Sequence, residues 1–227
     1  MKEKTRMRAE DRRELILVAA TRVFGDYGYV GATTSQVAKA AGVSQPYVVR
    51  MFGTKEKLFV EVLSRALDRL LVSFRVVLAE ESDVPLGRRF GLAYVNLVSE
   101  PGVLLSLMHG FVLGSDPVVG KAARCGFMDV YHFLRNEAGF GPDEVQNFLA
   151  GGMMVNTMVG LRMTDDYETD PAVRELLTAA FPEKLDQLRA AAQLQRKREA
   201  TERETTKRET TKRETTERET TEREAQA

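Results

Sequence analysis

The amino-acid sequence predicts an all-α protein with an N-terminal three-helix domain followed by a larger helical domain. Nearly every segment between residues 10 and 195 repeats apolar side chains at the three- to four-residue spacing of an amphipathic helix. No convincing run alternates apolar and polar residues as a half-buried strand does. Prolines such as Pro101, Pro117 and Pro142 mark the starts of successive helical patterns, where a missing backbone N–H costs little.

The first two helices are delimited by their end signals. The first is expected over about residues 10–26, after which Gly28 interrupts the apolar pattern. The second begins at Thr33 or Thr34, because a hydroxyl there can accept a hydrogen bond from a free amide of the first turn. Gly42 ends this helix, since glycine readily adopts the left-handed conformation that follows many helices.

A third, short helix follows almost without a linker. Ser44 can cap it, Pro46 is tolerated in its first turn and Gly53 ends it. Thr54 then caps a fourth, long helix that continues through Phe74.

The larger domain is expected to form helices near residues 85–99, 101–114, 117–138, 142–163 and 172–195, the last kinked or restarted at Pro182. The helix near 142–163 is apolar almost all round, which indicates burial on more than one face. One of its faces is expected to contact a second copy of the chain, and the alternative is a central core helix of a monomer. The stripe assigned to this dimer interface consists of Phe148, Gly152, Val155 and Val159.

The charges are unevenly distributed although their formal sum is zero. Residues 1–60 carry eleven Lys and Arg against six Asp and Glu, a net charge of +5. Residues 61–195 carry twelve against eighteen, a net charge of −6. The N-terminal segment is therefore basic, which suits a nucleic-acid partner.

The segment TTSQVAKAAGVSQPYVVRMFG, residues 33–53, has the spacing of a helix-turn-helix. Such a unit holds its second helix clear of the body so that it can enter the major groove of DNA. A helical wheel of the second helix points Val48, Val49 and Phe52 inward. The same wheel points Pro46, Tyr47, Arg50 and Met51 outward.

Several side chains of this unit suit contacts to bases and phosphates. Gln45 offers the paired donor and acceptor that match adenine, and Arg50 can read guanine or bind a phosphate. Lys55 is a cation in the first turn of a helix, where it opposes the helix dipole, so a phosphate is its expected partner. The full set of expected DNA-contacting residues is Thr33, Thr34, Ser35, Ser44, Gln45, Pro46, Tyr47, Arg50 and Lys55.

The stretch TTSQVAKAAGVSQPYVVRMFGTKEKLF resembles the DNA-binding segment of the TetR family of transcriptional regulators. The matching residues are Thr34, Val37, Ala38, Ala41, Gly42, Val43, Ser44, Phe52, Lys55, Glu56 and Leu58, preceded by Phe24, Gly28 and Tyr29. The tyrosine that is usual in the family at the position of Val49 is absent, and Tyr47 is expected to supply an aromatic contact instead. The resemblance is strong over about residues 10–70 and extends beyond them only in architecture and length.

The resemblance implies a homodimer that binds a palindromic operator in double-stranded DNA, usually as a repressor, and that a small ligand in the C-terminal domain releases. Two-fold symmetry also suits a short recognition helix, because one such helix reads only a few base pairs. The chain is accordingly divided into a basic N-terminal arm (1–9), a DNA-binding domain (10–60, with the helix-turn-helix at about 33–52) and an effector-binding and dimerisation domain (61–195).

The last part, residues 196–227, is expected to be a solvated tail. It repeats RETTK or RETTE with a period of five, which places no stripe on a helix and offers nothing apolar to bury. A disordered tail and a frayed helical extension both fit this composition. A role as a binding arm is disfavoured because ten Lys and Arg nearly cancel nine Asp and Glu.

The larger domain is rich in methionine, an adaptable side chain that suits pockets for varied hydrophobic ligands. We therefore expect a hydrophobic or amphipathic small effector, and ordinary core packing is the alternative explanation. The residues expected to contact the effector are Tyr94, Met108, Phe111, Met128, Met153, Asn156 and Met158. No cofactor is expected.

Two other classes of protein are weighed. Cys125, Asp129 and His132 share one helix face and could bind a metal in a metal-dependent sensor, although that face is the polar one and only His109 offers a distant fourth ligand. A helical interaction protein that has lost specific DNA binding is the second alternative, and the basic N-terminal segment argues against it. An enzyme is not expected, because neither a Gly-rich phosphate loop nor paired catalytic carboxylates are present.

The expected location is the cytoplasm. The single cysteine, Cys125, excludes an intrachain disulfide framework and fits a reducing compartment. The charged N-terminal residues show no signal peptide, and no apolar run approaches the roughly 20 residues that span a bilayer. We therefore expect no membrane partner.

Overall fold

The computed structural model describes residues 8–181 and, beyond them, residues 185–186, 188–190, 192–193, 196–197 and 201. Nearly all of the basic arm expected over residues 1–9, and nearly all of the repeat tail expected over residues 196–227, lie outside the described residues. The chain divides into two compact units, residues 1–163 and residues 164–227. The boundary expected between residues 60 and 61 falls inside one long helix.

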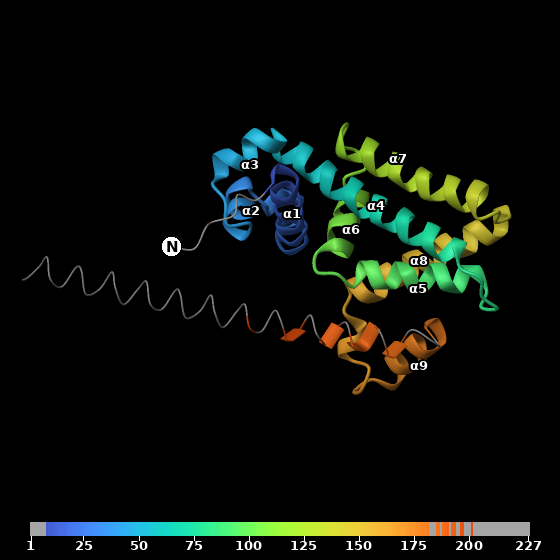
Figure 1. Ribbon diagram of the computed structural model, residues 1–227. Helices are drawn as coiled ribbons and strands as arrows, with labels where there is room; N and C mark the ends of the chain where they lie inside the picture. Colours follow the sequence, from blue (N-terminus) through green and yellow to red (C-terminus); the bar gives the residue numbers. More distant parts are fainter. Residues whose placement is uncertain are drawn as a thin grey trace, which may run out of the picture. The chain divides into compact units, whose positions relative to one another are not determined.

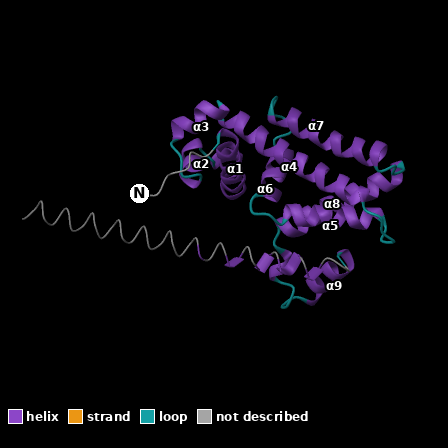
Figure 2. Cartoon of the chain, viewed as in Figure 1, coloured by secondary structure: helices purple, strands orange, loops and turns teal. Residues whose placement is uncertain are grey.

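Every regular element of the described residues is helical, which confirms the all-α prediction (Figure 2). The helices of the first unit are α1 (Ala9–Gly31), α2 (Thr34–Ala40), α3 (Gln45–Phe52), α4 (Lys55–Ala79), α5 (Leu86–Val98), α6 (Val103–Val112), α7 (Val119–His132) and α8 (Pro142–Gly160) (Figure 1). A π-helical turn, Phe133–Glu137, follows α7, and a 3-10 turn, Met163–Asp165, follows α8. The second unit contains α9 (Pro171–Ala180).

The predicted helix ends mostly agree with the structure. Thr33 caps α2 in a capping box with Gln36, and the Thr54 hydroxyl accepts a hydrogen bond from the backbone N–H of Lys57 at the start of α4. Gly28 adopts φ 67° and kinks α1 near its end. The helix expected over residues 172–195 is broken after Ala180, because proline cannot continue the backbone hydrogen bonding. The described residues 185–186, 188–190 and 192–193 are helical again, which agrees with the restart expected at Pro182.

A first hydrophobic core joins α1, α2, α3 and the beginning of α4. Its fully buried members include Phe24, Val37, Val48 and Phe59. The rings of Phe24 and Phe59 meet edge to face with centroids 4.7 Å apart. This core fixes the angle between the short helices and α4.

A second hydrophobic core joins the later part of α4 to α5, α8 and the π-helical turn. Phe74, Phe90 and Phe133 are buried there, and the Phe74 and Phe90 rings stack at 4.6 Å. The helix α4 therefore belongs to both cores and connects the N-terminal helices to the larger helical body (Figure 1).

The helix α6 packs against α1 at very short range. Gly102, with φ 80°, precedes α6 and lies against the backbone of Thr21 and Arg22, where no Cβ would fit. The hydroxyl of Ser106, in α6, donates a hydrogen bond to the Thr21 carbonyl oxygen at 3.1 Å. The body thus holds α1 through backbone contact as well as side chains.

No single helix among the described residues is long and apolar enough to span a membrane. The helices α5 and α6 reach that length and apolarity only when taken together, and they are bent by 97° relative to each other.

Candidate nucleic-acid interface and ligand cavity

The turn between α2 and α3 is made by a glycine in the left-handed conformation. Gly42 has φ 64°, and the backbone N–H of Val43 donates a hydrogen bond to the Ala38 carbonyl oxygen at 3.0 Å. This geometry satisfies the end of α2 within a few residues and lets α3 begin at Gln45. Val37 of α2 and Val48 of α3 are both fully buried, so the two short helices share one core.

The outer surface of α3 carries most of the side chains expected to contact DNA. Gln45, Pro46 and Arg50 are exposed, and Tyr47 is half-buried. The Arg50 guanidinium lies 5.0 Å from the centre of the Tyr47 ring, and that of Arg12, from α1, lies 5.6 Å from it. These distances are within cation–π range, so the Tyr47 ring is held by two basic residues at one surface.

Three orientations predicted for α3 differ from the structure. Val49, expected to point inward, is 39% exposed. Tyr47 and Met51, both expected to point outward, are half-buried against the N-terminal core. Ser44 occupies the N-cap position without a capping hydrogen bond from its hydroxyl. The reason is that Pro46 has no N–H and the Tyr47 N–H bonds the Ser44 carbonyl oxygen.

The hydroxyl residues at the start of α2 lie beside this surface. Thr33 and Ser35 are exposed and Thr34 is half-buried. The Thr33 hydroxyl is engaged in the capping box, while the Gln45 amide donates to the Thr34 hydroxyl at 3.3 Å and connects the two helices. Thr34 of α2 and Gln45 of α3 are therefore brought together at one surface.

Lys55 has partners within the chain that its neighbours in the sequence do not indicate. Its Nζ lies 2.8 Å from the Tyr29 carbonyl oxygen, 3.2 Å from that of Val30 and 3.1 Å from that of Ala32. These carbonyl groups are at the end of α1, where a cation complements the helix dipole. The unfavourable interaction of Lys55 with the dipole of α4 is thus offset by its favourable interaction with the dipole of α1. A phosphate is not needed to explain the position of this lysine.

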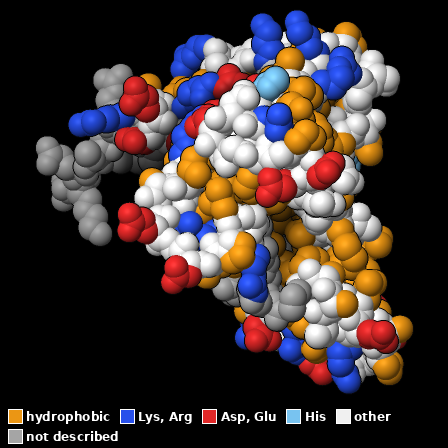
Figure 3. All heavy atoms as spheres, turned by 90° about the vertical axis from the view of Figure 1, so that its right-hand side faces the viewer, with side chains coloured by type: hydrophobic (Ala, Val, Ile, Leu, Met, Phe, Trp, Pro, Cys, Tyr) orange, Lys and Arg blue, Asp and Glu red, His pale blue; other side chains and the backbone are white. Residues whose placement is uncertain are grey.

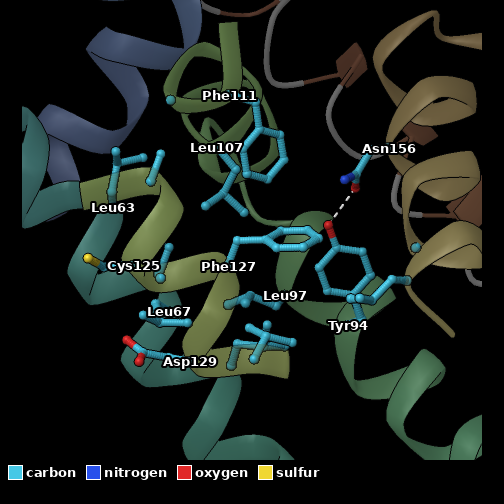
Figure 4. A pocket seen from close by; sticks show the side chains of 18 of the residues that line it. Leu63, Leu67, Tyr94, Leu97, Leu107, Phe111, Cys125, Phe127, Asp129 and Asn156 are labelled. Atoms are coloured by element: carbon cyan, nitrogen blue, oxygen red, sulfur yellow. Dashed lines mark hydrogen bonds between the residues drawn. The ribbon is translucent and has the colours of Figure 1, made fainter. Parts of the chain in front are cut away.

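The body contains a cavity of about 250 Å³ between α4, α5, α6, α7 and α8 (Figure 4). Four of the residues expected to contact an effector line it: Tyr94, Phe111, Met153 and Asn156. Met108, Met128 and Met158 are not among its described lining residues. Met158 is buried elsewhere and Met128 is 43% exposed, so methionine content alone was a poor guide to the cavity.

The polar centre of the cavity is a hydrogen-bonded pair. The Tyr94 hydroxyl donates to Oδ1 of Asn156 at 2.5 Å, and Asn156 is 2% exposed (Figure 4). Burial raises the pKa of Tyr94 to about 12, with the hydrogen bond to Asn156 opposing part of that rise. The phenol therefore remains neutral at physiological pH and continues to donate.

Three of the four residues predicted to form a dimer interface make contacts within the chain or are buried in it. The Phe148 ring packs edge to face against Phe74 and Phe90, and Gly152 lines the cavity beside Tyr94. Val155 is 7% exposed and Val159 is half-buried. The assignment to a dimer interface stays a prediction, because an apolar helix has several faces and its sequence does not indicate which one packs within the chain.

Other apolar side chains do reach the surface. On the face shown in Figure 3, hydrophobic side chains gather in patches bordered by charged groups. The large exposed apolar residues include Phe127 and Met128 of α7, Met153 and Met154 of α8, and Leu161, which follows α8. Met128, Met154 and Leu161 do not line the cavity, so these three are candidates for a contact with a second copy of the chain.

The alternative of a metal site finds no support in the described part of the chain. No three His, Cys, Asp or Glu side chains lie there in an arrangement that could hold a metal ion. Cys125 and Asp129 were expected on a purely polar face of α7, but both border the cavity.

Residues 16–62 match the family model described as bacterial regulatory proteins, tetR family. The chain is 37% identical over 78 residues to the transcriptional activator FasR of Mycolicibacterium smegmatis, covering 34% of this chain and 36% of FasR. It is 45% identical over 47 residues to the transcriptional repressor AcnR of Corynebacterium efficiens, covering 21% of this chain and 25% of AcnR. The matched segments thus span between a quarter and about a third of these relatives.

The fold of the chain is also similar to solved structures. A TetR-like transcriptional regulator from Rhodococcus sp. RHA1 superposes with a TM-score of 0.54 at 21% identity, covering 82% of this chain and 96% of that structure. The helix-turn-helix, its family match and the surrounding helical fold agree. Residues 16–62 therefore belong to the DNA-binding domain of the tetR family of bacterial regulatory proteins.

Proposed function

We propose that the protein is a DNA-binding transcriptional regulator, active as a homodimer on a palindromic operator, whose DNA affinity falls when a small molecule occupies the cavity. The surface formed by Gln45, Tyr47 and Arg50 on α3 carries this proposal. It combines an amide and a guanidinium suited to base edges with a ring that lies within cation–π range of two guanidinium groups. Repression is the more common mode that the family resemblance implies, although FasR is named an activator and AcnR a repressor.

The two helices that touch both the cavity and α1 support a link between ligand and DNA. The helix α6 lines the cavity through Leu107 and Phe111 and packs on α1 through Ser106. The helix α4 lines the cavity through Leu63 and holds the end of α1 through Lys55. A ligand that displaces either helix would also move α1 relative to α3, which changes the spacing of two recognition helices in a dimer.

The proposed homodimer would have the same two-fold symmetry as a palindromic operator. Two copies of α3 would read half-sites one helical turn of DNA apart, about 34–36 Å, or a multiple of that distance. The exposed apolar residues Met154 and Leu161 support an interface between copies. Sedimentation of the purified 25.4 kDa chain at micromolar concentration should show a species of twice that mass.

The experiment that tests the proposal is a selection of genomic fragments bound by the purified full chain. A recovered motif with inverted repeats that competes away binding supports a sequence-specific dimeric regulator. Fragments with no common motif would contradict sequence-specific regulation. Transcription from a reporter that carries the recovered motif, measured with and without the protein, then assigns repression or activation.

A further inference from the structure

The described residues that line the cavity include no Lys, Arg or His, so the wall offers no cationic group to an anionic ligand. Most of its wall is formed by aliphatic and aromatic side chains such as Leu97, Leu107 and Phe127. A carboxylate or phosphate moved from water into such surroundings would lose its hydration without gaining a cationic partner. The composition of the wall therefore disfavours anions in its inner part.

The carboxylate and thiol groups at the edge of the cavity do not provide a partner for a cationic ligand either. In Figure 4 the Asp129 carboxylate and the Cys125 sulfur point away from Tyr94, on the other side of α7 from the Phe127 ring. Asp129 is also exposed to solvent. A cationic ligand seated next to Tyr94 would thus lie away from the only described carboxylate of the wall.

The Tyr94–Asn156 pair leaves one hydrogen-bond donor unused. Oδ1 of Asn156 accepts from the Tyr94 hydroxyl, and Nδ2 reaches only the Met153 sulfur, at 3.7 Å. A thioether is a weak acceptor, and the second N–H of this amide has no partner among the described residues. In Figure 4 the amide nitrogen lies on the side of Asn156 that faces Phe111. A buried amide in this state favours a ligand that brings an acceptor.

We propose that the cavity binds an uncharged, mainly apolar small molecule whose single carbonyl oxygen, as in a ketone or an ester, accepts a hydrogen bond from Nδ2 of Asn156. This proposal deepens the proposed function and rests on it for its regulatory meaning, but not for the binding itself. Tyr94 acts as a positioning residue, because its hydroxyl fixes which end of the Asn156 amide faces the ligand. A cavity of about 250 Å³ suits a compact ligand, below the ~300–1,000 Å³ usual for larger ones.

The test is calorimetric titration of the full chain, without DNA, with three probes of matched chain length: methyl hexyl ketone, octanoate and octylamine. We expect the ketone to bind at least about tenfold more tightly than either charged probe, because only the charged probes lose hydration without compensation. Equal or tighter binding of octanoate or octylamine would overturn the assignment of ligand class. Absence of ketone binding would overturn it as well.

The variant that tests the acceptor contact is Asn156→Leu, which keeps a similar volume and removes the amide. This change should lower the affinity for the ketone by about threefold to tenfold, which is the contribution of one neutral hydrogen bond. The matched control is Asn147→Leu, an exposed asparagine of the same helix that does not line the cavity, and it should bind like the parent. Unchanged ketone affinity in Asn156→Leu would overturn the contact.

A second variant covers the case in which Asn156→Leu does not fold. Tyr94→Phe removes only a hydroxyl, which frees the Asn156 amide to rotate, so we expect the ketone to lose affinity relative to the parent. Retained ketone affinity in Tyr94→Phe, with circular dichroism like that of the parent, would overturn the positioning role.

Operator binding then separates this inference from the proposed function. Ketone binding without any change in operator affinity would leave the ligand class standing and contradict the regulatory link. Failure of the ketone to bind, in a chain that binds an operator specifically, would overturn the ligand class alone.

Discussion

Gly25 of α1 and Gly102 before α6 lie so close that a Cβ added to Gly25 would be 2.5 Å from the Cα of Gly102. A Cβ added to Gly102 would be 2.3 Å from the Thr21 carbonyl oxygen, in a backbone with φ 80° that strains any other residue. Both positions are glycine because the two backbones touch. This contact is where the larger body meets the first helix of the DNA-binding region.

Replacing Gly102 with alanine is therefore expected to destabilise the protein strongly. Left-handed strain and the backbone overlap together should lower the free energy of unfolding by about 3 kcal/mol or more. The control is Gly151→Ala, because Gly151 is exposed within α8 and its added Cβ meets nothing within 4 Å. That change should raise the free energy of unfolding by roughly 0.5–1 kcal/mol. Urea denaturation measures both, and similar midpoints for the two variants would refute the close contact.

Lys55 is expected to contribute to folding as well as to the basic surface. Lys55→Met removes a cation that bonds three carbonyl groups and lies 4.8 Å from the Tyr29 ring centre. The loss should lower the free energy of unfolding by about 1–3 kcal/mol and weaken binding to all DNA sequences alike. Lys57→Met, an exposed lysine of the same first turn, should change stability by no more than about 0.5 kcal/mol. Equal stability of the two variants, measured by thermal unfolding, would argue against the capping role.

The ends of the short helices were predictable from sequence because they depend on local chemistry. Gly42 and Gly53 have positive φ, and Thr33 and Thr54 cap their helices as expected. Each signal needs only the few residues around it. The order and type of the elements in the first unit followed from these signals together with apolar periodicity.

Contacts between distant segments were not predictable in this way. The partner of Lys55 is the end of α1, more than twenty residues away, and nothing near Lys55 in the sequence indicates it. The inward position of Met51 arises similarly, because α3 has only eight residues and its angle is set by the core it packs on. The cavity depends on which apolar side chains leave space between five helices, a property that no periodicity records.

The ionisation of Tyr94 is expected to make stability fall at high pH. Burial holds its pKa in the folded protein at about 12, whereas an unfolded tyrosine titrates near pH 10. Above pH 10 the unfolded state loses a proton that the folded state keeps, so the unfolded state is favoured increasingly up to about pH 12. Urea midpoints measured from pH 8 to pH 12 should fall less steeply for Tyr94→Phe than for the parent. Parallel curves would show that Tyr94 is not buried in this way.

Arg50 is expected to contribute sequence specificity to DNA binding. Arg50→Ala removes both a base-reading guanidinium and a cation beside the Tyr47 ring, which should cost about 1–3 kcal/mol for the operator and little for unrelated DNA. Lys121→Ala, an exposed lysine of α7 far along the chain, is the control and should leave both affinities unchanged. Fluorescence anisotropy with operator and scrambled duplexes measures the difference. An equal loss on both duplexes would assign Arg50 to phosphate contact only.

The most direct test of the central claim is a titration of the full chain against its selected operator and a scrambled duplex across a range of salt concentrations. We predict tight, sequence-dependent binding whose logarithm falls linearly with the logarithm of salt, with a slope of about −0.9 for each phosphate contacted. Weak binding that is the same for both duplexes at every salt concentration would contradict the claim that α3 reads DNA.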